Sequence, residues 1–207
     1  MLIVGPAVES VKEYLELYEE RSPDLPACPR CGGPLRKHGR YHRKVIMAEG
    51  IVEIPLYRGY CPRCRRTGAA MPAFLKPYAR YPADLREKVL EAHIADGRTW
   101  REAGDLVFAT AMAPVRKTLV RWARDAETIA VSATTLLAEY VTRLEPTLDQ
   151  RRLWPSRPRE RWPDLELLFR YGRYLRDLLV SLLPGKRPFL GVFTFLRLQR
   201  RDPVILL

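Results

Sequence analysis

The chain has 207 residues, 47% of them hydrophobic and 10% aromatic, a composition that excludes general disorder and allows one sizeable domain or a few small ones. Its 36 Lys and Arg residues outnumber its 24 Asp and Glu residues, so the formal net charge is +12. Twelve basic side chains fall within residues 28–81, where only Glu49 and Glu53 oppose them. A positive field concentrated in one segment favours a polyanion partner over a merely solvated basic surface.

Residues 1–27 are expected to hold an amphipathic helix and a linker. Val8, Val11, Leu15 and Tyr18 recur at helical spacing, which predicts a helix over residues 7–20. Neither a signal peptide nor an apolar run approaching the roughly 20 residues of a membrane span is evident. We therefore expect a cytoplasmic protein, in which paired cysteines favour a metal site over disulfides.

All four cysteines stand in two Cys-x-x-Cys pairs, Cys28 with Cys31 and Cys61 with Cys64. In such a pair the tight turn points both thiolates at one metal ion, and two pairs complete a tetrahedral shell of four sulfurs. The pattern predicts a closed structural site for Zn²⁺. His38 and His42 are the other soft ligands nearby, and we interpret them as exposed polar residues.

The spacing of the two pairs also resembles that of rubredoxin, an iron-containing electron carrier. Rubredoxins are typically acidic and have a glycine after each pair. Here Gly32 follows the first pair, but Arg65 follows the second. We therefore favour zinc and keep iron as the alternative.

Between the cysteine pairs the pattern predicts a β-hairpin, with strands over 43–47 and 51–60 around a turn at 48–50. Val52, Ile54 and Leu56 alternate with other residues, and Pro55 favours an edge or a bulge. This is the plan of a zinc ribbon, whose core is too small to fold without metal. Residues 67–82 are interpreted as a connector. The basic ribbon side chains that we expect to hold phosphates are Arg40, Arg43 and Lys44.

Three closely spaced helices are predicted between residues 84 and 124. Asp84 is a possible cap of the first helix, Thr99 opens a capping box at the second, and Pro114 suits the start of the third. Three such helices can form a helix-turn-helix whose last helix enters the DNA major groove, although a plain three-helix bundle has the same periodicity. The third helix is expected to carry Val115, Leu119, Trp122 and Ala126 inward, and to present Arg116, Lys117, Thr118, Arg121 and Arg124 to DNA.

Residues 28–124 resemble the N-terminal zinc ribbon and helix-turn-helix of bacterial insertion-sequence transposases. The matching segments are CPRCG, KHGRYHRK, YRGYCPRC, RTGAAMPAFLKPYARY and TLVRW. Ala113 departs from the family pattern, which usually has a small polar cap there. The resemblance implies a module that recognises transposon ends, with DNA cleavage left to a separate acidic domain.

Residues 132–207 are predicted to be a helical region with a basic loop at 151–162, a long helix at 165–183 and an apolar tail. The tail is expected to complete a core or to form a partner-binding strand. The region holds eight carboxylates in no pattern that indicates a nuclease, so we expect no enzyme activity.

The sequence thus predicts a mainly α fold with a small β zinc ribbon. The expected domains are 1–27, 28–81 (zinc ribbon and connector), 82–131 (helix-turn-helix) and 132–207. The expected partner is double-stranded DNA, with RNA left open. The alternative functions are a protein-interaction module that docks a partner through its C-terminal helices and, less favoured, an electron carrier.

Overall fold

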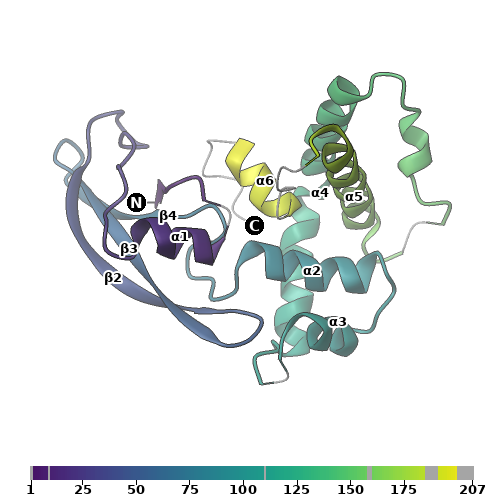
Figure 1. Ribbon diagram of the computed structural model, residues 1–207, viewed down its shortest axis with the longest axis horizontal. Helices are drawn as coiled ribbons and strands as arrows, with labels where there is room; N and C mark the ends of the chain where they lie inside the picture. Colours follow the sequence, from purple (N-terminus) through teal and green to yellow (C-terminus); the bar gives the residue numbers. More distant parts are fainter. Residues whose placement is uncertain (1, 9, 110, 158–159, 185–190, 200–207) are drawn as a thin grey trace. The chain divides into compact units, whose positions relative to one another are not determined.

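The computed structural model describes residues 2–8, 10–109, 111–157, 160–184 and 191–199 (Figure 1). The chain divides into two compact units. Among the described residues, the sheet unit extends to Asp84 and includes Phe193–Gln199, and the helical unit runs from Leu85 to Val192. The described residues form a small β-sheet and six α-helices, so the fold is mixed.

The sheet has four strands in the order β1-β4-β3-β2. Strands β2, β3 and β4 are antiparallel, and β1 pairs in parallel with β4. Their bounds are β1 Leu2–Val4, β2 Arg36–Ile46, β3 Ile51–Cys61 and β4 Arg66–Met71. The predicted hairpin is present, but β2 begins earlier than expected, at Arg36.

Two details of the sheet differ from the sequence interpretation. Strand β4 lies in the segment interpreted as a connector, because Arg66–Ala69 pair with the last residues of β3. Strand β3 is central and not an edge strand. Its pairing with β4 covers only Arg58–Cys61, so Pro55, which has no backbone N–H, lies in a part of β3 whose described partner is β2 alone.

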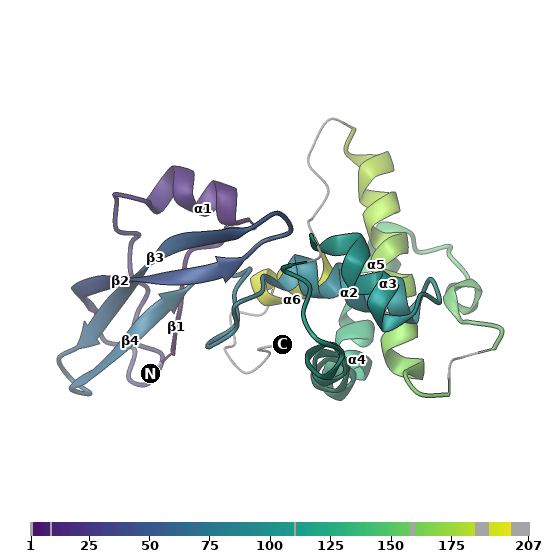
Figure 2. The same ribbon diagram turned by 90° about the horizontal axis from the view of Figure 1, so that it is seen from below.

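Helix α1, Val11–Tyr18, covers the core of the sheet unit (Figure 2). It is shorter than predicted, because Ser10 caps its start by accepting a hydrogen bond from the Glu13 N–H. Tyr14 is fully buried and donates a 2.7 Å hydrogen bond from its hydroxyl to the Pro55 carbonyl. Burial raises the pKa of Tyr14, so this phenol stays neutral and the polar group is satisfied inside the core.

The helical unit contains most of the remaining helices. Their bounds are α2 Ala83–Ile94, α3 Trp100–Val107, α4 Arg116–Leu144 and α5 Pro163–Leu182, with the 3₁₀ helix η1 at Gln150–Leu153; α6 follows at Val192–Gln199. The predicted capping box at Thr99 is present. Two predicted helix starts are wrong. Asp84 lies inside the first turn of α2, and Pro114 lies before α4, whose N-cap is Val115.

Helices α4 and α5 pack on each other, and α4 is continuous across residues 131–132. Its buried stripe of small residues, Ala123, Ala126, Ala130 and Ala133, permits close packing. Glu127 in α4 accepts a 3.1 Å hydrogen bond from the Leu165 N–H near the start of α5. Among the described helices, none has both the length and the apolar character needed to cross a membrane.

Of the apolar tail, residues 192–199 form α6, in which Val192, Phe193 and Leu196 are buried. Burial of these side chains agrees with a role in core packing, which was the first of the two expectations for the tail. Residues 200–207 lie outside the described part of the chain.

Candidate metal centre and nucleic-acid interface

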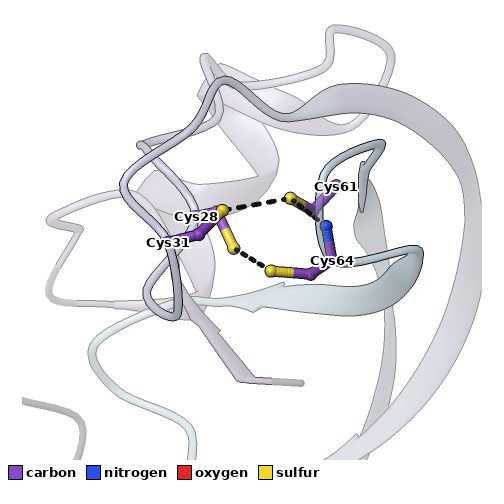
Figure 3. A group of neighbouring side chains, drawn as sticks. All are labelled: Cys28, Cys31, Cys61 and Cys64. Atoms are coloured by element: carbon purple, nitrogen blue, oxygen red, sulfur yellow. Dashed lines mark hydrogen bonds between the residues drawn. The ribbon is translucent and has the colours of Figure 1, made fainter.

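The four cysteines come together at one end of the sheet, from two turns that are far apart in the sequence (Figure 3). Cys28 and Cys31 precede β2, whereas Cys61 is the last residue of β3 and Cys64 lies in the turn to β4. The antiparallel pairing of β2 with β3 brings the two turns together, because Arg36 lies opposite Tyr60. The sheet therefore positions both cysteine pairs.

Backbone N–H groups form hydrogen bonds within both turns. Cys28 donates its N–H to the Gly33 carbonyl, and Gly32 donates to the Cys28 carbonyl. In the second turn the Cys64 N–H points at the Cys61 sulfur, 3.3 Å away. Backbone N–H groups directed at sulfur stabilise thiolates, which are the form that binds metal.

The sulfur positions suit a tetrahedral metal ion. The Cys28 and Cys64 sulfurs are 4.0 Å apart, the Cys31 and Cys61 sulfurs are 3.6 Å apart, and all four lie within 4.8 Å of one another. A tetrahedral shell with metal–sulfur distances of about 2.3 Å places its sulfurs about 3.8 Å apart. The donor set and its spacing can therefore hold a metal ion and are compatible with zinc.

The thiols of Cys28 and Cys64 differ in acidity. The backbone N–H of Arg30 lowers the pKa of Cys28 to about 7, whereas hydrogen bonding with the other thiols, that of Cys31 first, raises the pKa of Cys64 to about 12. Without a cation Cys28 therefore loses its proton more readily than Cys64. A bound metal ion displaces the remaining protons.

The surroundings of the cluster are cationic. Arg30, Arg63, Arg65 and Arg66 are all exposed around the two turns, and Arg63 lies 3.5 Å from the Cys31 carbonyl that accepts its hydrogen bond. Four thiolates around a divalent ion carry a net charge of about −2, which these guanidinium groups partly compensate. His38 and His42 are exposed on β2 and do not join the cluster.

The ribbon side chains predicted to contact DNA lie on β2 and differ in environment. Arg40 and Lys44 are exposed, and each has a local partner: Arg40 donates to the Glu19 carbonyl, and Lys44 lies 3.7 Å from Glu53. Arg43 is half-buried, and burial lowers the pKa of its guanidinium.

The side chains predicted to read DNA lie in the first turns of α4. Arg116, Lys117, Arg121 and Arg124 are exposed, and Thr118 is half-buried. The opposite side of these turns carries Leu119 and Trp122, both buried as expected. Val115 was expected to point inward but is 70% exposed, because it is the N-cap and lies before the helix proper.

The helix-turn-helix itself stays a prediction. Helices α3 and α4 contact each other, but eight residues, 108–115, separate them, more than the three or four of a compact helix-turn-helix turn. The structure places Arg116, Lys117, Thr118, Arg121 and Arg124 on α4, and it brings the four cysteines together in one cluster.

Sequence reasoning missed a groove beside β2. It is lined by ribbon residues together with Pro77, Tyr78 and Arg80 from the predicted connector. The signal in the sequence was the interleaving of Lys76, Tyr78 and Arg80, because alternating cations and aromatic rings are typical of nucleic-acid contact. The sequence did not indicate that this turn lies next to the edge of β2.

Together, the fold and the site define a small β-sheet with a cluster of four cysteines that could hold a metal ion, followed by helices. Comparison with protein-family models matches residues 28–122 to a domain of unknown function (DUF6431). The match begins at the first cysteine and ends within α4, so it includes the cluster, β2 to β4, α2 and α3. Comparisons with curated proteins and with solved structures give no match.

Proposed function

We propose that the protein is a zinc-stabilised DNA-binding protein that resembles the end-recognition module of insertion-sequence transposases and has no nuclease activity of its own. In this proposal zinc stabilises the cysteine end of the sheet, α4 contacts DNA, and ribbon cations hold phosphates. The protein has no open metal position in this scheme, because all four ligands come from cysteine.

Zinc is favoured by the chemistry of the donors. Zn²⁺ bound by four thiolates is the usual structural site of small domains with paired Cys-x-x-Cys turns. The sheet unit has a modest core, so cross-linking of its two turns by one ion contributes directly to folding. Ferric iron in the same shell is the alternative, and it gives a red protein.

The observation that carries the DNA-binding proposal is the charge at the start of α4. The first turn of α4 contains no acidic residue, and the N-cap Val115 makes no side-chain capping hydrogen bond. Arg116 and Lys117 lie where the helix dipole is positive, and each such cation destabilises a helix by roughly 0.3–1 kcal/mol. An uncapped, cationic helix start is unfavourable for the isolated fold but favourable for contact with phosphates.

Duplex binding as a function of salt tests the proposal. Zinc-loaded protein is titrated into a labelled random-sequence duplex between about 50 and 200 mM salt, and several phosphate contacts should weaken binding at least tenfold across this range. Selection from a random duplex pool then identifies any preferred sequence. Affinity that does not change with salt contradicts the proposal, because phosphate contacts release counterions.

A second candidate is a protein-interaction module. Three apolar side chains at the end of α5, Val180, Leu182 and Leu183, are each between 44% and 50% exposed. Exposed apolar side chains at this end of the helix favour a protein partner over DNA there. Capture of a partner that survives nuclease treatment and high salt, and that Leu182→Lys abolishes, supports this candidate.

A further inference from the structure

The sheet unit contains a groove of about 740 Å³ along the outer strand β2. Its walls include Tyr41, Arg43 and Lys44 of β2, Met71 of β4, and Tyr78 and Arg80 of the following loop. The loop is fixed to the strand, because the Ile46 N–H donates a 2.7 Å hydrogen bond to the Arg80 carbonyl. The groove is therefore part of the folded sheet unit.

Tyr78 has an unusual backbone conformation. The Ala79 N–H donates to the Lys76 carbonyl, and Tyr78, the third residue of this turn, has a φ of +61°. This is the pattern of a type II turn, with proline in its second position. The third position of such a turn normally holds glycine or asparagine, because other side chains are strained there.

Packing does not explain the tyrosine. Its side chain is 97% exposed, so the ring contributes almost nothing to the core of the sheet unit. Glycine would fit the turn with less strain and would expose no ring. A strained, fully exposed aromatic residue beside a groove indicates a ligand that uses the ring.

The groove has the charge of an anion site. Arg43, Lys44 and Arg80 line it, and no carboxylate is among its described lining residues, since Glu53, 3.7 Å from Lys44, lies outside the lining. Arg43 is the most enclosed of these cations, and burial is the main cause that lowers its pKa; Arg80 lowers it further, whereas Tyr41 and Tyr78 oppose the change. A bound anion would relieve both effects, because it replaces lost hydration and screens the two guanidinium groups from each other.

We propose that this groove binds unpaired nucleotides of a DNA strand, with a base stacked on Tyr78 and the flanking phosphates held by Arg43, Lys44 and Arg80. This proposal rests on the proposed function, because it takes DNA as the ligand. It adds a site for a single strand to the duplex contact proposed for α4. In a duplex the bases are stacked on one another and do not reach a protein ring, so Tyr78 selects an open strand.

An acidic peptide fits the groove less well. The carboxylates of an acidic peptide would pair with the cations, but they would not stack on the exposed ring of Tyr78. Pairing of a peptide strand with the β2 edge also requires free backbone groups, and Arg80 already occupies the Ile46 N–H. Sites for single-stranded nucleic acid usually combine aromatic rings, on which bases stack, with cations that contact the phosphates.

The test uses full-length, zinc-loaded protein and a fluorescent oligothymidylate of about twelve nucleotides, a length within the usual site sizes of single-strand-binding folds. Tyr78→Gly should weaken binding about tenfold, and Tyr78→Phe should bind as wild type, since both rings stack. Tyr78→Gly should not lose stability, because glycine adopts a positive φ freely. We expect its urea midpoint to be equal to or above that of wild type. Weaker binding by this variant would then not be caused by unfolding.

The cations are tested separately. Arg43→Gln and Arg80→Gln should each lower the slope of log affinity against log salt by about 0.7, the value for one phosphate contact on a single strand. Lys12→Gln is the matched control, because it removes an exposed cation of α1 in the same unit, outside the groove. It should leave the slope unchanged.

The outcomes separate this inference from the proposed function. Oligothymidylate binding that Tyr78→Gly does not weaken overturns the groove proposal. So does the absence of oligothymidylate binding when duplex binding persists, which leaves the proposed function standing. Binding of poly-glutamate in place of the oligonucleotide overturns it in favour of an acidic peptide. If wild-type protein binds neither the duplex nor the single strand, both proposals are overturned.

Discussion

Gly32 and Arg65 occupy the same position, one residue after the second cysteine of each Cys-x-x-Cys pair, and both have a left-handed backbone, with φ of +67° and +53°. The two turns are therefore alike although their residues differ. The arginine does not mark a different turn, so its presence in place of glycine does not distinguish this site from that of rubredoxin. The feature that still distinguishes this chain from the typically acidic rubredoxins is its positive charge.

The Arg65→Gly variant should be more stable than wild type. A left-handed residue other than glycine costs about 1–2 kcal/mol, and the greater freedom of glycine in the unfolded chain offsets part of this gain. We expect a net stabilisation of about 0.5–1 kcal/mol, measured by urea denaturation of the zinc-loaded protein. Arg65→Ala is the control, since it removes the charge but keeps the strain. An equal gain in both variants would assign the effect to charge.

Removal of one ligand should abolish the metal site. Cys61→Ser is expected to lose stoichiometric zinc and to unfold the sheet unit, because the remaining three thiols cannot close the shell. Elemental analysis and circular dichroism measure the two effects, and a chelator should reproduce the second in wild-type protein. A colourless protein containing one zinc supports the zinc assignment. Unchanged zinc content in the variant contradicts the four-cysteine site.

The capping box of α3 gives a prediction for pH. Thr99→Ala should destabilise the protein by about 1 kcal/mol, because the Glu102 N–H loses its acceptor. Hydrogen bonds from the backbone and side chain of Thr99 hold the pKa of Glu102 below its usual value. The contribution of the carboxylate is therefore present above the usual glutamate pKa and is lost as the pH falls through the lowered one.

The difference in thermal stability between wild type and Thr99→Ala should accordingly shrink on acidification. Glu102→Gln is the control, because an amide can still accept a hydrogen bond but does not titrate. In the Glu102→Gln background the effect of Thr99→Ala should not change over the same pH range, because no group titrates at position 102 in either variant. A difference between wild type and Thr99→Ala that is constant with pH would count against a role for the charge.

Arg121 provides the test of α4 as the DNA-binding helix. Arg121→Gln should weaken duplex binding, and it should lower the salt slope by about one if the side chain contacts a phosphate. If Arg121 contacts a base instead, the variant should lose about 1–3 kcal/mol of binding free energy, and it should lose its preference at one position of the selected sequence. Arg170→Gln on α5 is a matched control, because its charge is paired with Glu166 in the same helix. Equal effects of both variants would point to net charge and not to α4.

The sequence was most informative where local rules decide the structure. Paired cysteines specify their own turns, so the metal cluster was predictable without any knowledge of the sheet. The hairpin followed from alternation, and the capping box from two residues three apart. The buried side of α4 was visible at Leu119 and Trp122, because helical periodicity does not depend on the partner.

Features that depend on distant segments were not predictable. Strand β4, RTGAAM, has small residues and no alternation, and it is a strand because β3 and β1 pair with it. The groove requires the turn at Tyr78 to meet the edge of β2, more than thirty residues earlier in the chain. Tyr78 itself breaks the rule that would have indicated its turn, since a tyrosine stands where glycine is expected.

The length of α4 has a mechanical consequence. At 1.5 Å per residue, its 29 residues form a rod about 43 Å long, with the exposed cations at one end and the contact of Thr142 with Gln150 near the other. Because the helix is uninterrupted, its two ends rotate and tilt as one body. A partner that changes the orientation of the far end thereby changes the angle at which the cationic end meets its ligand.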